Sequence, residues 1–567
     1  MQLNRASCDR ERWFLWIALA GSVLICVFLS ALAPATQLWD RDEPLYARTA
    51  VEMLRSGNWY LPTFNEEVFA HKPPLIYWLM AISAKIFGVN EFAFRFVSCV
   101  GLAISALFTF LIGRRLFDGR TALWAMAIFS TTAMSVYLGS AAMLDAVMLA
   151  WILLAFWSYV ELIWANGSRI GFCLLFCVGL ALSMLTKGPV GPAVVGSALL
   201  TTWALSSRSV RPGPELVALL AISAIVASGI FLLWAIPANA LSGGAIVNTG
   251  FWTHVVGRFL APMEGHGRGG IVGYLMTLPI YIPIILIGVM PWSVDLPETV
   301  AAVARGRLGG PAERAFLSGW ALSTFVMFSL AATKLPHYVF PLFPPISMAL
   351  AALHTTRLKN ANASNGVWRR VGEYGYVLLM AAGVLALGTA ALLFLELIDQ
   401  LLAFLTAIGI AAAGFTFLRM RRNARFGIAQ IMALISTPAF FLGLYWVVVP
   451  PFERDVKISR AIANSVAVHG DRSIPIFLAG YAEPSLIFYL DRSSARPVRS
   501  LPTDDVGLRD LVAASSEFIV VASEERYQHL KEVLGPSAHT LLSRHEALNL
   551  NAHARRQVII VAAFGVP

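Results

Sequence analysis

Charged side chains gather between two strongly apolar segments near the start of the chain, over residues 39–78. The acidic pair Asp42-Glu43 opens this stretch, and His71-Lys72 precedes two prolines toward its end. Ionisable groups are costly to leave unpaired near lipid, so a chemical role is worth seeking for them. A partly desolvated carboxylate can act as a general base toward a hydroxyl or an amine. The competing interpretation is that Asp42 only caps the helix expected to follow it.

Three lysines lie beside prolines at the ends of apolar segments, namely Lys72, Lys187 and Lys334. One such lysine is explained by a side chain that reaches from the apolar layer toward water. A proline fixes the backbone, however, and an ammonium group is a compact charge that suits a phosphate oxygen. Three of them on one membrane face, against the usual charge bias, indicate an anion there, and a lipid phosphate is the simplest candidate. His337 and Tyr338 follow the third lysine.

Two further places carry isolated polar groups. Asp145 is a lone carboxylate in an apolar stretch, so it should face a polar cavity or a cationic partner such as one of the lysines. A Gly-rich segment over residues 238–270 contains His254, Arg258 and His266. Metal-ligand spacing is absent from that segment, so we interpret it as a substrate loop.

The composition indicates what holds these residues. The chain has 567 residues, of which 57% are hydrophobic and 13% charged, whereas soluble proteins carry about 25% charged residues. Long apolar runs recur along it, as expected for many transmembrane helices. The net charge of +10 does not indicate nucleic-acid binding, because Lys and Arg fall mostly in short loops between apolar runs. The five cysteines lie in the N-terminal tail or in apolar runs, so no disulfide framework is expected.

The positive charges also set the topology. If the apolar run at residues 74–88 crossed the membrane, the arginines after residue 113 would face the side opposite the basic N-terminus. That run is also shorter than the roughly 20 residues that spanning requires, so we interpret it as an interfacial helix on the outer face. About thirteen spans remain, and the loops on one side are then all basic. The predicted spans are residues 13–34, 94–113, 121–140, 143–164, 170–186, 189–205, 215–237, 271–292, 315–332, 336–354, 374–396, 399–418 and 428–449.

The opposite face collects the chemically interesting groups. We assign residues 1–450 to a transmembrane catalytic domain whose first outer loop is 35–93, and residues 451–567 to a C-terminal domain on the same outer side. Short β-branched runs alternate with helical patterns in this tail, which predicts a small α/β domain. No phosphate-binding glycine motif or nucleophile motif is present, so a structural or acceptor-guiding cap is expected. The strand candidates are residues 474–479, 518–522 and 558–562, and the helix candidates are 456–468, 505–514 and 524–534.

Several of these features form an ordered set of motifs: Asp42-Glu43 with Tyr46-Ala47, Gly57-Asn58-Trp59-Tyr60-Leu61-Pro62, Lys72-Pro73-Pro74-Leu75 with Tyr77-Trp78, Leu144-Asp145, Thr186-Lys187-Gly188-Pro189, and Lys334-Leu335-Pro336 with Tyr338. In order and spacing this set resembles the GT-C superfamily of membrane glycosyltransferases that use polyprenyl-phosphate sugars. It is most similar to the bacterial aminoarabinose (lipid A) transferases and the protein O-mannosyltransferases. The fold class expected is a polytopic α-helical membrane protein of GT-C type, with about 13 transmembrane helices, juxtamembrane helices and a small C-terminal periplasmic α/β domain.

The resemblance implies an inverting transfer of a sugar from a polyprenyl (undecaprenyl) phosphate. Asp42 would be the catalytic carboxylate that deprotonates the acceptor, with Glu43 and Asp145 as further acidic positions. Cationic and hydroxyl groups would stabilise the phosphate as charge develops on it. The residues expected to hold the donor phosphate are Lys72, Lys187, Lys334, Tyr338, His337 and Arg258.

Two positions depart from the family pattern. His71 stands where the lipid A transferases typically carry a glutamate that is associated with a metal. Because imidazole can also bind metals, His71 is a candidate ligand for a divalent Zn, Mg or Mn ion. Leu45 stands where an arginine is common, which leaves both the sugar and the acceptor open.

These observations together predict a glycosyltransferase of the bacterial inner (plasma) membrane whose site faces the periplasm. The expected partners are a polyprenyl-phosphate sugar, membrane lipids and a lipid or glycan acceptor such as lipid A in lipopolysaccharide. Three alternatives stay open: a flippase or transporter for polyprenyl-linked glycolipids, an O-mannosyltransferase-like enzyme acting on protein, and an O-antigen-type polymerase or ligase. A transporter should carry charges near the membrane midplane and show repeated halves, and no repeat is visible.

Overall fold

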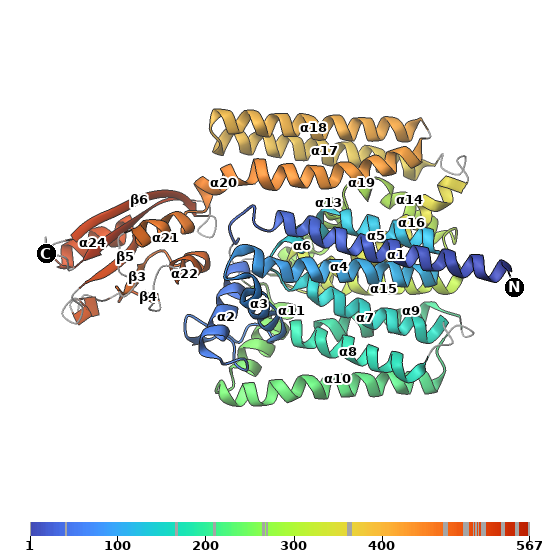
Figure 1. Ribbon diagram of the computed structural model, residues 1–567, viewed down its shortest axis with the longest axis horizontal. Helices are drawn as coiled ribbons and strands as arrows, with labels where there is room; N and C mark the ends of the chain where they lie inside the picture. The colour runs from blue at the N-terminus through green and yellow to red at the C-terminus, as the bar shows by residue number, and fades with distance from the viewer. Residues whose placement is uncertain are drawn as a thin grey trace.

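The computed structural model describes the chain except for residues 1, 40–41, 165–167, 208–210, 264–266, 268–269, 360–365, 424, 469–473, 492–497, 503, 505–506, 509, 512–516, 535–538, 550–554 and 565–567. Long apolar helices run side by side in one bundle, and a mixed sheet lies beyond one end of it (Figure 1). The protein is therefore a multi-pass membrane protein with a C-terminal α/β unit, as predicted.

Ten helices in the described residues are long and apolar enough to cross a membrane, or eleven if the bent pair α5 and α6, which meet at 63°, forms one span. The predicted spans outside this set lie on α9, which has 16 residues, and on α15. The number of helices that meet the length and hydropathy requirement is thus lower than the predicted thirteen. The bundle comprises α1 (Gln2–Leu32), α4 (Glu91–Leu116), α5 (Gly119–Thr131), α6 (Ala133–Ser140), α7 (Asp145–Trp164), α8 (Arg169–Lys187), α9 (Val190–Leu205), α10 (Pro214–Leu241), α12 (Gly270–Thr277), η3 (Leu278–Ile280), α13 (Tyr281–Gly288), α15 (Pro311–Leu330), η5 (Pro336–Leu342), α16 (Phe343–Lys359), α17 (Val367–Phe394), α18 (Leu397–Arg422) and α19 (Phe426–Gly443).

Local sequence signals set where these helices begin and end. The side chains of Asn90, Asp118 and Ser168 accept hydrogen bonds from the first turns of α4, α5 and α8. Gly188 ends α8 with φ +65°, a conformation that glycine adopts without steric cost. That stop leaves Lys187 in the last turn of α8, at the end of the bundle where the polar groups gather.

Short elements cover this end of the bundle, on the left in Figure 1. Helix α3 has 13 residues, which is too short for spanning and consistent with the predicted interfacial helix. Two other short elements, η4 (Trp292–Asp295) and α14 (Leu296–Ala304), belong to the opposite end. The elements of the polar end are α2 (Asp42–Ser56), the hairpin β1 (Thr63–Phe64) and β2 (Glu67–Val68), α3 (Leu75–Phe87), the π-helix η2 (Ile246–Gly257) and α11 (Arg258–Leu260).

The C-terminal part contains a five-stranded sheet of order β4-β3-β5-β7-β6, in which β3 pairs in parallel with β4 and β5, and β7 is antiparallel to its neighbours. Alternate residues of β3 and β5 pack against α21 and α22 on one face and against α24 on the other. Three strands and two helices fall where the sequence predicted them, and the 505–514 helix lies mostly outside the described residues. Strand β6 and helix α22 were not predicted. The elements are η7 (Leu444–Val448), α20 (Val449–Val456), α21 (Ser459–Val468), β3 (Ile476–Ala479), α22 (Pro484–Asp491), β4 (Arg499–Ser500), β5 (Phe518–Ser523), α24 (Glu524–Leu534), β6 (His539–Asn549) and β7 (Arg555–Phe564).

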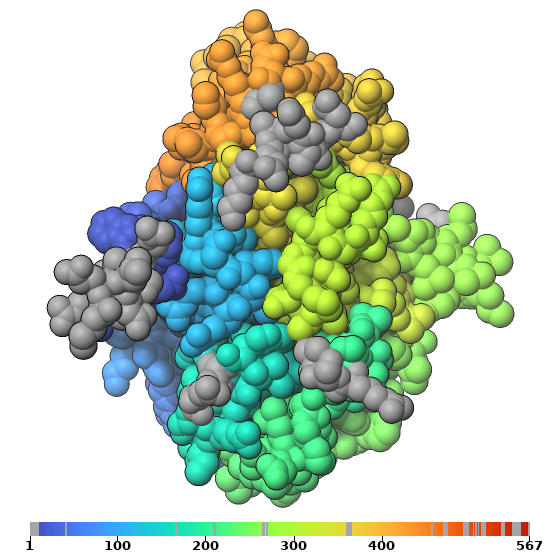
Figure 2. Space-filling model, turned by 90° about the vertical axis from the view of Figure 1, so that its right-hand side faces the viewer, coloured from blue at the N-terminus to red at the C-terminus, as the bar shows by residue number. Residues whose placement is uncertain are grey.

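The view from the opposite end of the bundle shows only membrane-helix ends and their loops (Figure 2). Helices α17–α19, in orange, form a lobe on one side of this face, and the green helices around α10 lie on the other side. The C-terminal sheet is hidden behind the bundle in this view. Figure 1 shows the sheet beyond the other end of the bundle, which is the polar end.

Candidate active site

Two cavities meet at the polar end of the bundle. One has a volume of about 680 Å³ and apolar walls from α8, α10, η2 and α15, including Trp234, Phe251 and Phe328. The other has a volume of about 900 Å³ and a more polar lining from α2, α6, η5 and η7. The cavities share three lining residues, which are His71, Lys72 and Arg258. A ligand with an apolar chain and an anionic head can therefore fill the first cavity and present its head to the second.

Lys72 lies in this shared wall, immediately before the two prolines that lead into α3. Burial, followed by the nearby charges of Arg258 and Lys187, lowers the pKa of Lys72 to about 8. Within the described part of the chain, its ammonium group makes no hydrogen bond or ion pair. An anion bound here would offset the repulsion between Lys72 and the cations Arg258 and Lys187, and it would give the ammonium group a partner.

Asp42 is the first residue of α2 and lines the polar cavity only. The hydroxyl of Tyr46, one turn later, donates to Asp42 Oδ1 at 3.3 Å. Burial and the charge of Asp42 raise the pKa of Tyr46, so this hydroxyl remains a donor at neutral pH. Asp42 thus lines the cavity from the first turn of a helix.

Glu43 differs from its neighbour in that its carboxylate is fully engaged. Arg95 on α4 donates to it through Nε (2.8 Å) and Nη2 (2.7 Å). The backbone N–H groups of Trp39 and Ala142 donate to it at 2.6 and 2.5 Å. The side chain is 3% exposed, and these contacts lower the pKa of Glu43 against the effect of burial. Glu43 also lines the polar cavity, and its predicted catalytic role stays a prediction.

Asp145 begins α7 and lines neither cavity, with 1% of its surface exposed. Lys187 Nζ donates to its Oδ1 at 2.6 Å, and His337 Nε2 lies 3.9 Å from its Oδ2. Asp145 Oδ2 accepts no hydrogen bond in the described structure. The predicted pairing of Asp145 with a lysine is present, whereas its predicted catalytic role stays a prediction.

Tyr338 and Arg258 complete the wall of the apolar cavity. Arg258 Nη1 donates to the Tyr338 hydroxyl at 3.2 Å, and Lys187 Nζ lies 5.1 Å from the centre of the Tyr338 ring. His337, the preceding residue, faces the polar cavity instead. Five of the six residues predicted to hold the phosphate therefore line one cavity or the other.

Lys334 is the sixth, and it lies apart from the other five. Its ammonium group turns back to donate to the carbonyls of Ser329 and Phe328 at the end of α15. The rings of Tyr274 and Tyr281 lie 5.6 and 5.8 Å from it, and it lines neither cavity. Lys334 satisfies the orphan carbonyls of a helix C-terminus, which is a structural use of the same Lys-Pro pattern.

Few side chains that could bind a metal ion lie near His71, where the sequence predicted one. The His71 ring packs at a tilt against Phe69 and His254, with centroids 4.3 and 4.1 Å away. Gly250 lets η2 approach this ring pair, because a Cβ there would lie 2.6 Å from the Ala70 carbonyl oxygen. Among the described residues, no three His, Cys, Asp or Glu side chains converge to hold a metal ion. The nearest charged groups, Lys72 and Arg258, are cations, so this donor set does not fit a divalent cation and no step below uses one.

The sequence pointed less clearly to other residues of this site. Arg95 is buried in the structure. Its one signal in the sequence is that a charged residue lies at the start of an apolar span. Of the loop at 238–270, His254 lies beside His71 and its pKa is lowered to about 3, first by burial and then by neighbouring cations. Glu264, His266 and residues 40–41 lie outside the described residues.

The sequence is similar to those of known proteins. The family model for dolichyl-phosphate-mannose-protein mannosyltransferase matches residues 71–234, which include Lys72, Asp145 and Lys187. An undecaprenyl phosphate-alpha-4-amino-4-deoxy-L-arabinose arabinosyl transferase of Edwardsiella ictaluri is 33% identical over 357 residues, which cover 61% of this chain and 60% of that protein. The transferase of the same name from Yersinia pestis is 29% identical over 423 residues, covering 72% of this chain and 73% of the relative.

Two solved structures share the fold over nearly the whole chain. The crystal structure of ArnT from Cupriavidus metallidurans bound to undecaprenyl phosphate matches with a TM-score of 0.73, 19% identity and 97% of each chain covered. The apo structure of the same protein matches with a TM-score of 0.69 over 98% of each chain, again at 19% identity.

The chain shares its fold with the ArnT structures, and its sequence is similar to those of transferases in the GT-C class that use polyprenyl-phosphate sugars. Within that class it resembles the aminoarabinose transferases, so the resemblance predicted from the motifs is confirmed.

Proposed function

We propose that this protein is an inverting glycosyltransferase that moves a sugar from a polyprenyl phosphate, such as undecaprenyl phosphate, to a lipid or glycan acceptor such as lipid A. The observation that carries the proposal is the shared wall of the two cavities. The apolar cavity suits the isoprenyl chain, and Lys72 and Arg258 suit the phosphate at its end. Asp42 lines only the polar cavity, where an acceptor would enter.

The reaction is a single displacement. Asp42 takes the proton from the acceptor hydroxyl, whose oxygen forms a bond to the anomeric carbon of the sugar. The bond between that carbon and the phosphate oxygen breaks, and its electron pair leaves with the lipid phosphate. Lys72 and Arg258 stabilise the charge that develops on this leaving group. Lys187, held by Asp145, and Tyr338 complete the anion-binding wall.

The relatives support the nature of the donor. Two curated relatives are named as undecaprenyl-phosphate aminoarabinose transferases, and a structure of the same fold is bound to undecaprenyl phosphate. We further propose that the protein resides in a bacterial inner membrane with the site and the C-terminal domain in the periplasm. The basic loops at the other end of the chain's spans support this orientation.

The test supplies the purified full-length protein with radiolabelled polyprenyl-phosphate sugars and with lipid A, other glycolipids or peptide as acceptors. Label appearing on lipid A or a glycolipid is the expected result. Label on peptide instead would overturn the acceptor class in favour of O-mannosyltransferase-like activity. Translocation of the donor across vesicles with no sugar transfer to any acceptor would overturn the enzyme in favour of a transporter.

A further inference from the structure

Residues 33–39, which are the described part of the segment that joins α1 to α2, are held from two sides. On the side of the membrane helices, Arg95 of α4 donates to the carbonyls of Ala33 at 2.7 Å, Thr36 at 2.8 Å and Gln37 at 2.6 Å. Such a run of consecutive irregular backbone is otherwise free to adopt many conformations. The position of α2, and of the carboxylate at its first residue, depends on how this segment is fixed.

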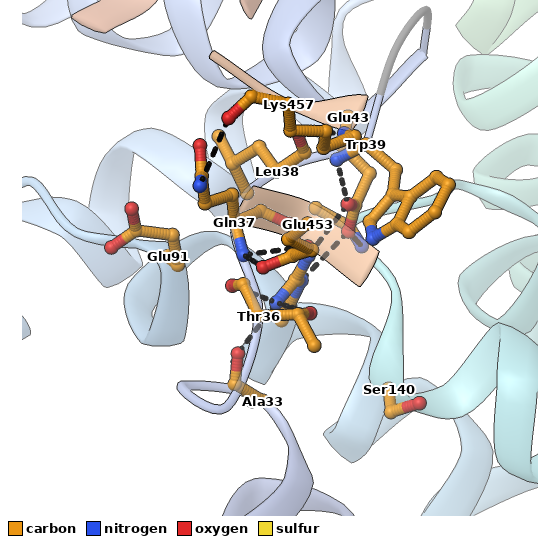
Figure 3. Close-up of polar contacts among 12 residues, drawn as sticks. Ala33, Thr36, Gln37, Leu38, Trp39, Glu43, Glu91, Ser140, Glu453 and Lys457 are labelled. Atoms are coloured by element: carbon orange, nitrogen blue, oxygen red, sulfur yellow. Dashed lines mark hydrogen bonds and ion pairs between the residues drawn. The ribbon is translucent and has the colours of Figure 1, made fainter. Parts of the chain in front are cut away.

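The second side is supplied by the C-terminal part of the chain. Both carboxylate oxygens of Glu453 accept from the Gln37 N–H, at 3.1 and 3.0 Å, as Figure 3 shows. Lys457 Nζ donates to the Leu38 carbonyl at 2.6 Å. The hydroxyl of Tyr489 accepts from the Leu38 N–H at 3.0 Å. Three side chains, from α20, from its C-terminal end and from α22, thus bind the backbone of two consecutive residues, Gln37 and Leu38.

This contact extends into the polar cavity through Trp39. The ammonium group of Lys457 lies 4.4 Å from the centre of the Trp39 ring, and the Trp39 N–H donates to Glu43. Trp39 and Asp42 line the same cavity. A shift of Lys457 would therefore move Trp39 and its hydrogen bond to Glu43. Because Glu43 follows Asp42 directly, the carboxylate that we propose as the base would move with it.

The domain that carries these side chains is itself anchored on the same elements. The Tyr489 hydroxyl donates to Glu91 Oε1 at 2.8 Å, and Arg460 forms an ion pair with the same carboxylate at the start of α4. Arg48 on α2 forms a buried ion pair with Asp491 at the end of α22. The domain therefore contacts both α4 and α2. Such hydrogen bonds and ion pairs hold the residues of a site in fixed positions.

We propose that the C-terminal domain positions the active-site carboxylate, with Glu453, Lys457 and Tyr489 as positioning residues that fix residues 37–39 and so the entry into α2. This inference rests on the proposed function. None of the three residues lines either cavity, so their effect should fall on turnover and not on donor binding. A small displacement of a reacting group reduces the rate steeply even where substrate still binds.

The test uses full-length protein in lipid nanodiscs. Lys457→Met removes the ammonium group and keeps an apolar chain over Trp39, and Tyr489→Phe removes only the hydroxyl. Each should lower kcat by about tenfold or more, with the Kd for polyprenyl phosphate unchanged, and Lys457→Arg should restore most of kcat. Lys531→Met is the matched control, because Lys531 lies over Tyr527 on α24 at the far face of the sheet.

Hydrogen exchange gives a second readout that needs no activity. The peptide covering residues 33–46 should exchange faster in Lys457→Met than in wild type, and at the wild-type rate in Lys531→Met. Unchanged exchange, or kcat within about twofold of wild type in both Lys457→Met and Tyr489→Phe, would overturn the inference. A parallel loss of kcat, donor affinity and thermal stability would reduce these residues to a structural role and also overturn it. Absence of transfer by wild type and by Lys531→Met would overturn the proposed function instead, while the exchange result still decides the positioning.

Discussion

The two ends of the helix bundle treat buried charge in opposite ways. At the end away from the sheet, Asp295 is 1% exposed and each of its oxygens accepts two hydrogen bonds. Arg357 Nη1 and Arg421 Nη2 donate to Oδ1 at 2.5 Å each, and Oδ2 binds Arg421 Nη1 at 2.8 Å and His354 Nε2 at 2.9 Å. Nothing remains on this carboxylate for a ligand to bind.

At the polar end, an equally buried carboxylate is only half satisfied. Asp145 binds Lys187 through one oxygen and leaves the other without a hydrogen bond in the described structure, with His337 at 3.9 Å. Beside it, Lys72 has a lowered pKa and lines both cavities. Saturated charge serves to join helices, whereas unsaturated charge next to a cavity is the mark of a site that expects a ligand.

The largest expected effect is on activity at the polar end. Asp42→Asn should lower the transfer rate by about 10²- to 10⁴-fold, because it removes the proposed general base and keeps the shape of the side chain. The measurement is the initial rate of radiolabel transfer, with the unfolding temperature recorded for each variant. Asp118→Asn is the control, since asparagine also caps α5 at that position. A rate near that of wild type for Asp42→Asn would remove Asp42 from the chemistry.

At the saturated end the expected effect is on stability instead. Arg421→Met leaves Asp295 buried with two of its four hydrogen bonds lost, which should reduce stability by about 3–5 kcal/mol. Arg422→Met is the neighbouring control, because Arg422 is largely exposed and should change stability by about 1 kcal/mol at most. Thermal unfolding in detergent measures both, and the Kd for polyprenyl phosphate should not change in either. Weakened donor binding in Arg421→Met would show that the two ends are not independent.

The ionisation of Lys72 predicts a pH dependence of donor binding. The pKa of Lys72 is lowered to about 8 in the free protein, so its ammonium form predominates below that pH and is lost above it. Bound phosphate favours the charged form, so donor affinity should be constant below pH 8 and fall by up to about tenfold per unit above it. Isothermal titration calorimetry between about pH 6.5 and 9.5 measures the donor affinity and checks this dependence. In Lys72→Arg the fall should be absent, and an identical fall in that variant would assign the titration to another group.

The smallest effects separate the two lysines that share a sequence pattern. Lys187→Met should weaken binding of polyprenyl phosphate by about tenfold, because it removes a cation from the cavity wall and leaves Asp145 unpaired. Lys334→Met should leave the Kd within about twofold of wild type, because that ammonium group binds backbone carbonyls away from both cavities. Equal losses in the two variants would contradict the distinction between them.

Sequence reasoning found the polar end because charge stands out in an apolar chain. Lys72, Lys187 and Asp145 were each conspicuous for that reason, and the lysine–aspartate pair is present. Lys334 has the same flanking proline, and only the direction of the chain at the end of α15 turns its ammonium group away. Which of the two adjacent carboxylates binds an arginine depends on Arg95 of α4, and no local pattern reveals that long-range partner.

The C-terminal domain illustrates the same limit. Its strands and helices follow from β-branched and helical patterns, so their predicted positions were largely correct. The contacts of Glu453 and Lys457 with residues 37 and 38 join parts of the chain that are more than four hundred residues apart. These contacts arise from the packing of the domain on α2 and α4, which composition and periodicity do not encode.

The shared wall of the two cavities also has a kinetic consequence. His71, Lys72 and Arg258 border both cavities. In the proposed function the donor and the acceptor bind in separate cavities, so neither must dissociate before the other binds. Both substrates can then be bound together, and no sugar needs to rest on the protein between two half-reactions. Initial rates measured while both concentrations are varied should therefore give intersecting lines in double-reciprocal plots, as a ternary complex does, and not the parallel lines of a ping-pong enzyme.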